Sequence, residues 1–301
     1  MEIPMNQQEQ SRFDTLYQKH LTMLKLQGKA DKTIEAYARA VRRLACFLDR
    51  CPEQVDNDEL EAYSTQLLDT RSWSTVKLDK HGIRFFFEHT LGQPMPWLRA
   101  VKAPKTQVLP DILTPREVST LISRTEKMSI AAFWFVTYSL GLRLGESLHL
   151  HSSDIDRQRQ LVHVRRGKGN KDRFVILPQA TLAVLTDLWR SHHHPVLLFP
   201  ASSGGSGVMH RGTLQRAFKR VCADCNIHKR VSIHSLRHSY ATHLIETGLD
   251  LNTLRQQLGH ADLKTTSRYV RMTEVSHARS NTLVNDLITP LHQAWRRRIK
   301  Q

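Results

Sequence analysis

The sequence predicts a mostly α-helical protein of two domains, with a small β-hairpin in the second domain. Three observations predict this fold class. Apolar residues recur at helical spacing along most of the 301-residue chain, which indicates amphipathic helices. A stretch near residue 105 contains prolines and loses this spacing, which indicates a linker. One later stretch alternates apolar and polar residues, as a β-strand does.

Four helices are expected within residues 12–90. Apolar residues at helical spacing mark the first three of them: Phe13, Leu16, Tyr17, Leu21 and Leu24; Ile34, Tyr37, Val41, Leu44 and Leu48; Leu60, Tyr63, Leu67 and Leu68. We expect Ser74 to cap the fourth helix, which ends in the apolar IRFFF of residues 83–87. Gly and Pro in LGQPMP then break the pattern. A helical N-terminal domain is therefore predicted at residues 12–100.

The linker is expected at residues 101–113, and the second domain begins directly after it. Thr114 is a suitable N-cap, Pro115 suits the first helical position, and Glu117 completes a capping box. The helix through SIAAFWFVTYSL is expected to stop at Gly141.

The rest of the second domain, residues 114–290, combines a hairpin with further helices. LVHVRR and RFVIL have strand patterns, and GKGNKD between them has the composition of a turn. More helices are expected around residues 180–190, 212–225, 235–247, 251–258 and 262–270. Gly248 and Gly259 fit helix C-termini. Residues 291–301 are expected to form a basic tail.

The charge of the chain favours a polyanionic partner. The chain carries 44 Lys and Arg against 28 Asp and Glu, a net charge of +16. Residues 1–100 hold 14 of each sign, so the whole excess follows residue 100. Such an excess is typical of nucleic-acid-binding proteins, although a merely basic protein stays an alternative. ARAVRR at residues 38–43 still gives the N-terminal domain a candidate basic face.

Other patterns bound the cellular setting. The N-terminus lacks the apolar core of a signal peptide, and the longest apolar run, IAAFWFV, is too short to cross a bilayer. Four cysteines do not suggest a disulfide framework. We therefore expect a cytoplasmic protein without a membrane partner.

A metal site is the first of three interpretations of the histidine-rich and cysteine-containing segments. Structural zinc usually takes four ligands, and Cys222 with Cys225 supplies one pair near an apolar helix face. We favour core packing for that pair and an exposed loop for the histidines at 192–194. No metal and no cofactor is expected.

An anion site is the second interpretation. Arginine is planar, always charged and able to make two hydrogen bonds to one phosphate. Arg143 lies between a helix stop and a helix start, and Arg237 lies three residues after His234 on one predicted helix face. The third interpretation is a basic surface without chemistry. Taken singly, Arg143 could pair with Glu146, and Arg237 could be a surface charge.

Three further residues have side chains that could transfer a proton or act as a nucleophile. Lys168 stands between glycines at the hairpin tip, where a lysine can deliver a proton. His260 follows Gly259, and Tyr269 comes nine residues later. A phenol oxygen is a competent nucleophile. A solvated turn lysine and a half-buried packing tyrosine are the alternatives.

Taken in order, these residues resemble the signature of the tyrosine recombinase (phage integrase) family. That signature is Arg, Lys in a β-hairpin, His-x-x-Arg, His and Tyr, and the sequence fills all six positions: Arg143, Lys168, His234, Arg237, His260 and Tyr269. The local sequence around these residues is most similar to that of Xer-like and transposon-borne bacterial members. The resemblance covers the whole chain, with a helical core-binding (DNA-clamp) domain followed by an α+β catalytic domain.

The resemblance implies site-specific DNA recombination through a 3′-phosphotyrosyl intermediate at Tyr269. It implies that Arg143 and Arg237 hold the phosphate, that Lys168 is the general acid and that His260 is a further donor. His234 would assist as acid or base. We expect Glu146 to orient the site by pairing with Arg143 or a histidine, while His238 and His243 support packing or the surface.

The resemblance also implies the partners. Double-stranded DNA would be bound by a homotetramer on two DNA sites, or by a heterotetramer with a second recombinase, in a bacterial cytoplasm at the nucleoid. The C-terminal tail would dock onto a neighbouring protomer. Two alternatives stay open: a type IB topoisomerase-like enzyme, and a DNA-binding accessory factor without catalysis. The resemblance is compatible with two kinds of recombination: integration or excision of a DNA element, and resolution of DNA dimers.

Overall fold

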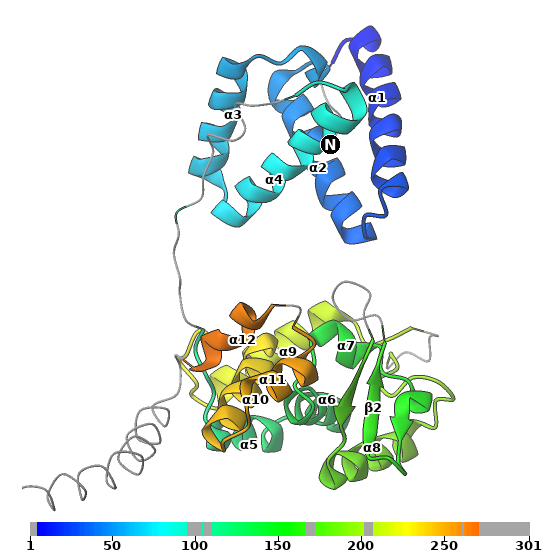
Figure 1. Ribbon diagram of the computed structural model, residues 1–301, viewed down its shortest axis with the longest axis vertical. Helices are drawn as coiled ribbons and strands as arrows, with labels where there is room; N and C mark the ends of the chain where they lie inside the picture. Colours follow the sequence, from blue (N-terminus) through cyan, green and yellow to red (C-terminus); the bar gives the residue numbers. More distant parts are fainter. Residues whose placement is uncertain are drawn as a thin grey trace, which may run out of the picture. The chain divides into compact units, whose positions relative to one another are not determined.

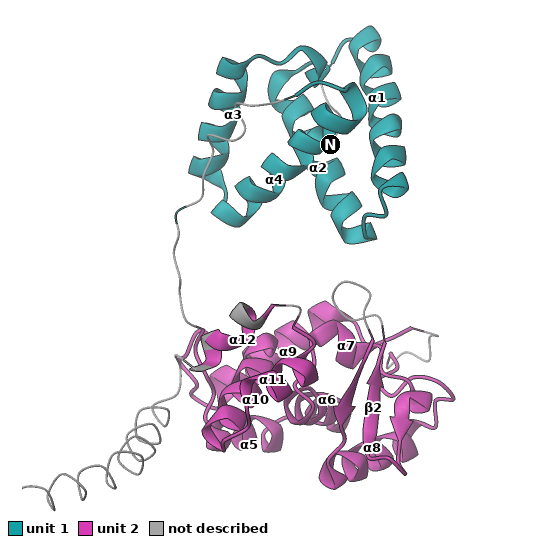
Figure 2. Cartoon of the chain, viewed as in Figure 1, with its two compact units in different colours: residues 1–107 teal, residues 108–301 magenta. Residues whose placement is uncertain are grey.

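The computed structural model describes residues 5–94, 104, 110–165, 172–201, 207–260 and 262–270. The chain forms two compact units, residues 1–107 and residues 108–301 (Figure 2). Helices dominate both units, and the second unit contains a three-stranded sheet (Figure 1). The predicted fold class is thereby confirmed.

Unit 1 contains the four predicted helices. They are α1 (Gln7–Leu26), α2 (Asp31–Leu48), α3 (Asn57–Thr70) and α4 (Trp73–Phe85), with a 3-10 turn at Pro52–Gln54 and a π-helical segment, η2, at Phe86–Leu91. Most of the residues that mark the helical spacing are buried in its core, among them Phe13, Val41, Leu44, Leu60 and Tyr63, whereas Leu68 is exposed. Burial of these apolar faces is the main favourable free-energy term for the unit.

The predicted start of α4 is wrong by two residues. The N-cap is Ser72, whose backbone is extended, and Ser74 lies inside the helix. The Ser72 hydroxyl is 3.2 Å from the Thr75 hydroxyl, so a side chain in the first turn binds it. Either serine has the chemistry of an N-cap, and the sequence pattern alone did not separate them.

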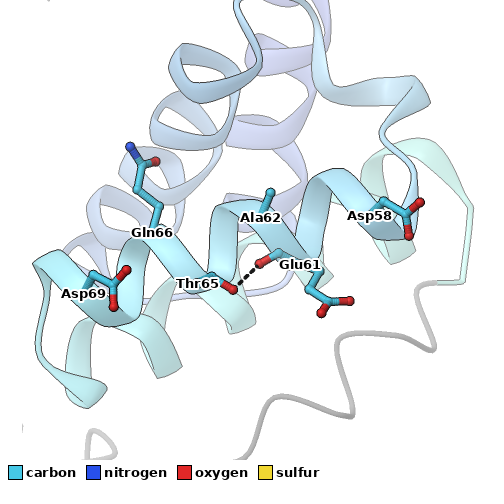
Figure 3. A pocket seen from close by; sticks show the side chains of 6 residues that line it. All are labelled: Asp58, Glu61, Ala62, Thr65, Gln66 and Asp69. Atoms are coloured by element: carbon cyan, nitrogen blue, oxygen red, sulfur yellow. Dashed lines mark hydrogen bonds between the residues drawn. The ribbon is translucent and has the colours of Figure 1, made fainter.

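Unit 1 separates its charges onto different faces. Asp58, Glu61 and Asp69 follow one face of α3 (Figure 3). A groove of about 920 Å³ lies between α2 and α3. Three arginines of α2, the C-cap arginine of α3 and two aromatic rings line it: Arg39, Arg42, Arg43, Arg71, Phe47 and Tyr63. The balanced charge of this unit therefore includes a basic surface, as the arginines of α2 predicted.

Unit 2 places its sheet between helical segments of the chain. The elements are α5 (Pro115–Ser123), α6 (Met128–Ser139), α7 (Leu144–Leu148), a 3-10 turn (Ser152–Asp154), β1 (Ile155–Asp156), β2 (Leu161–Val164), β3 (Arg173–Ile176), α8 (Gln179–His192), α9 (Arg211–Asp224), α10 (Ile233–Glu246), α11 (Leu251–Leu258) and α12 (Leu263–Val270). The predicted capping box at Thr114 and Glu117 is present.

The strands are antiparallel in the order β1-β2-β3, and Val162 pairs with both Ile155 and Val175. Val162 and Val175 are buried in one core with residues of α6, α8, α9 and α10. The sequence did not reveal β1, because a strand of two residues has no alternation to recognise. None of the helices in the described ranges combines the length and apolar character needed to cross a membrane.

Candidate active site

A buried carboxylate organises the basic residues of unit 2. Glu146, in α7, leaves 7% of its side chain exposed, and its oxygens accept hydrogen bonds from Arg143 at 2.7 Å and from Arg173 at 2.8 and 2.9 Å. Arg237 lies 3.7 Å from the same carboxylate. The predicted pairing of Glu146 with Arg143 is confirmed. One anion thus fixes three guanidinium groups from separate elements.

The pKa of Glu146 reflects this setting. Burial opposes its ionisation, but hydrogen bonds and charge from Arg173, and then from Arg143, outweigh burial and lower the pKa to about 2. Glu146 therefore stays ionised at neutral pH.

Arg237 joins three elements. Its side chain, 4% exposed, extends from α10 and donates hydrogen bonds to the Gly141 carbonyl at 2.7 Å and to the Leu258 carbonyl at 2.6 Å. Burial, and then the charge of Arg143, lower its pKa, but an arginine starts high enough to remain a cation at neutral pH. The alternative of a surface charge at this position is wrong.

His260 links Arg237 to the tyrosine. Gly259 ends α11 in the left-handed conformation, as predicted, and turns the chain so that His260 meets Arg237. The His260 Nε2 lies 3.0 Å from an Arg237 nitrogen, and Nδ1 lies 2.9 Å from the Thr266 hydroxyl. Because arginine only donates, Nε2 accepts and the ring is neutral. Burial, followed by the charge of Arg237, lowers the pKa of His260 to about 3.

Tyr269 is enclosed in the same cluster. It comes from α12, is 1% exposed, and its ring lies nearly parallel to that of His260 at a centroid distance of 6.3 Å. Its hydroxyl is 3.0 Å from Nδ1 of His238. Sequence reasoning assigned His238 to packing or the surface and so missed this contact. The i, i+4 spacing of His234 and His238 on α10 was the available signal.

One predicted site residue, His234, stands apart from these contacts, and another, Lys168, cannot be compared with them. His234 is exposed on the first turn of α10 and lines a groove of about 690 Å³ with Leu144 and Arg211. Partial burial, and then the charge of Arg237, lower its pKa. Lys168 lies outside the described residues.

Arg173 is a functional candidate that the sequence did not single out. It is the first residue of β3, and besides Glu146 it binds the Gln257 carbonyl at 2.8 Å. The sequence RFVIL was interpreted as a strand from its apolar residues, and this pattern gave no indication of a role for the arginine that begins it. Because Arg173 begins β3, its side chain ties the start of that strand to α7 and α11.

The remaining predictions for this unit concern packing. His243 binds the Tyr138 hydroxyl at 2.9 Å, which confirms its packing role. Cys222, in α9, is buried in the core of unit 2, as expected. The loop prediction for the histidines is wrong for His192, which ends α8 and whose ring faces the Leu198 carbonyl. Within the described ranges, no group of three metal-binding side chains converges.

The arrangement is suited to a reacting anion. Arg143 is held by the Glu146 carboxylate, and Arg237 is held by the Gly141 and Leu258 carbonyls beside the same carboxylate. Little reorganisation is therefore needed when negative charge develops beside them. A buried phenol lies within the same chain of contacts, and a phenol oxygen can form a covalent ester with such an anion. The site thus combines a phenol that is chemically able to act as a nucleophile with fixed cations.

Known proteins with related sequences point to the same chemistry. Residues 111–275 match the phage integrase family, and residues 16–97 match the phage integrase N-terminal SAM-like domain. The tyrosine recombinase XerA of Pyrococcus furiosus is 32% identical over 257 residues, which cover 84% of this chain and 87% of XerA. An integrase/recombinase of Pseudomonas aeruginosa is 30% identical over 292 residues, covering 82% and 86% of the two chains.

Solved structures share the fold. A crystal structure of XerA recombinase is 25% identical, covers 90% of this chain and 98% of its own, and gives a TM-score of 0.51. A lambda integrase tetramer bound to a Holliday junction is 18% identical over 85% of this chain and 76% of its own, with a TM-score of 0.70, and so shows the fold alone. With its sequence relatives and its domain matches, this chain belongs to the phage integrase family and is a tyrosine recombinase.

Proposed function

We propose that this recombinase cleaves and rejoins double-stranded DNA with Tyr269 as its nucleophile. The observation that carries the proposal is a continuous series of contacts. Tyr269 lies against His260, His260 meets Arg237, and Arg237 and Arg143 share the Glu146 carboxylate. A phosphodiester held by the two arginines would therefore lie close to a phenol.

In the proposed cleavage step, Arg143 and Arg237 bind the non-bridging oxygens of the scissile phosphate. The Tyr269 hydroxyl gives its proton to a base, for which His234 is the candidate, and its oxygen attacks phosphorus. A 3′-phosphotyrosyl bond forms, and the bond to the 5′ oxygen breaks. Lys168 gives that oxygen a proton. Rejoining reverses these steps with the 5′-hydroxyl of a partner strand. The ester conserves the bond energy, so the proposed reaction uses no cofactor.

The two site histidines have different proposed roles. The neutral ring of His260 accepts from Arg237, so it could donate to phosphate only after gaining a proton. The negative charge of a bound phosphate favours that proton. His234, at the exposed start of α10, is proposed to act as an acid or base at the edge of the site.

The proposed assembly follows from the domain organisation and the relatives. We propose that residues 12–100 form a DNA-clamp domain and residues 114–290 the catalytic domain. One solved relative is a lambda integrase tetramer on a Holliday junction. By analogy, four copies of this chain, or two copies with two of a second recombinase, would act on two DNA sites, with the basic C-terminal tail on a neighbour. The reaction would take place at the bacterial nucleoid in the cytoplasm.

A suicide substrate tests the nucleophile. DNA from the flanks of the gene, nicked near the cleavage point, is incubated with the wild type, with Tyr269→Phe, and with Tyr138→Phe as a control tyrosine outside the site. A covalent protein–DNA band on a denaturing gel is expected with the wild type and the control only. Specific binding without any adduct would contradict catalysis and favour an accessory DNA-binding role. Relaxation of supercoils without strand exchange would favour the topoisomerase-like alternative.

A further inference from the structure

The hydroxyl of Tyr269 has a protein partner that no family motif residue supplies. Its oxygen is 3.0 Å from Nδ1 of His238, and the two rings are tilted by 45° with centroids 5.7 Å apart. Since Tyr269 is 1% exposed, water does not set the direction of the hydroxyl. The hydrogen bond to His238 is then a main determinant of where the phenol oxygen points.

The other two histidines near the site are poorly placed for this task. His260 stacks on the Tyr269 ring, but its two nitrogens already face Arg237 and the Thr266 hydroxyl. His234 is exposed on the first turn of α10. His238 is adjacent in sequence to Arg237, so one rigid helix carries both a proposed phosphate ligand and the partner of the nucleophile.

We propose that His238 is a positioning residue whose Nδ1 holds the Tyr269 oxygen beside the arginine cluster. This inference rests on the proposed role of Tyr269 as nucleophile. A nucleophile that is misplaced by even a small distance attacks more slowly, because the reacting atoms must be close and aligned. His238 thus contributes to the cleavage rate without forming or breaking a bond itself.

Two substitutions separate a hydrogen bond from the rest of the side chain. His238→Asn places a polar atom close to the position of Nδ1 and keeps the hydrogen bond. His238→Phe keeps an aromatic ring and loses the bond. His243→Phe is the matched control, since it removes a histidine–tyrosine hydrogen bond of the same kind, 2.9 Å long, from the same helix.

The first readout is the rate of covalent adduct formation on the suicide substrate at saturating protein. We expect His238→Phe to be slower by about tenfold, as loss of one hydrogen bond predicts, with DNA affinity unchanged. His238→Asn and His243→Phe should stay within about threefold of the wild type. Equal losses in both His238 variants would overturn the proposal, because that pattern marks a lost proton acceptor. Wild-type rates in both would overturn it too.

The second readout needs no DNA. Nitration of Tyr269 by tetranitromethane, followed by mass spectrometry, reports release of the phenol from its buried position. His238→Phe should nitrate faster, and His238→Asn should match the wild type; equal nitration of all three would overturn the proposal. If the wild type forms no adduct, the proposed function fails, while the nitration result still decides whether His238 holds Tyr269.

Discussion

At the residue scale, the Glu146 carboxylate determines the stability of the arginine cluster. Glu146→Gln should lower the free energy of opening of unit 2 by about 3 kcal/mol at pH 7, because buried guanidinium groups lose their counter-charge. Hydrogen exchange of peptides from α6 and α10 measures that free energy. Glu35→Gln is the control, since Glu35 leaves 66% of its side chain exposed in its pair with Arg39, and it should change little.

The effect of Glu146→Gln should depend on pH. The pKa of Glu146 is about 2 in the fold against an ordinary 4.5, so its ionisation stabilises the folded state. That contribution is complete above pH 4.5 and is lost as the pH falls toward 2. The difference between wild type and Glu146→Gln should therefore shrink below pH 4.5. A difference that stays constant down to pH 3 would contradict the ion-pair explanation.

At the element scale, the end of α11 depends on a glycine. Gly259 has φ +62°, and a Cβ there would come within 2.8 Å of Cδ of Arg173. Gly259→Ala should lower the free energy of unfolding by about 1–2 kcal/mol, because alanine disfavours the left-handed backbone. It should also displace Arg173 from Glu146. Gly28→Ala is matched to it, because Gly28 also has φ +62° but nothing within 4 Å of an added Cβ.

Comparing the two glycine variants isolates the contact with Arg173. Both variants should lose a similar free energy of unfolding from the strained backbone, measured by hydrogen exchange of the helix that precedes each glycine, α1 or α11. Only Gly259→Ala should also slow adduct formation, because the added methyl group displaces Arg173 from Glu146. Equal activity in both variants would show that Arg173 accommodates the methyl group without moving.

Arg173 itself should couple the hairpin to the site. Its side chain is 9% exposed and binds both Glu146 oxygens and the Gln257 carbonyl. Arg173→Gln should destabilise unit 2 by about 3 kcal/mol and reduce adduct formation, although it keeps every residue of the family signature. Arg190→Gln removes an ion pair whose side chains are 69% and 71% exposed, and it should change neither quantity appreciably.

The elements show which parts of the structure the sequence could predict. Helices such as α11, Leu251–Leu258, were predicted within their bounds because apolar spacing and a terminal glycine act locally. The contacts of Arg173 and His238 could not be predicted in the same way. They depend on how β3, α10 and α12 pack, and residues far apart in sequence meet there only after folding. The motif order predicted candidate reacting groups, but it gave no information on the partners that hold them.

At the scale of the whole molecule, charge is distributed so that each unit can contribute to DNA binding. The whole net charge of +16 comes from residues after position 100. Unit 1 nevertheless places the exposed Arg42 and Arg71 together in the groove between α2 and α3. The carboxylates on α3, shown in Figure 3, form a face that would repel phosphate. A unit of balanced charge can therefore still bind DNA in one orientation.

That separation of charge leads to a prediction from salt dependence. Arg42→Gln combined with Arg71→Gln should weaken binding to duplex DNA and reduce the slope of log affinity against log salt by about 2, roughly one for each lost phosphate contact. The matched control neutralises Glu61 and Asp69 on the acidic face of α3 as Glu61→Gln and Asp69→Asn; binding should then be unchanged or tighter. Filter binding or fluorescence anisotropy between about 50 and 200 mM salt measures both slopes. If the arginine variant kept the wild-type slope, the groove would not contact phosphate, and DNA binding would depend on unit 2.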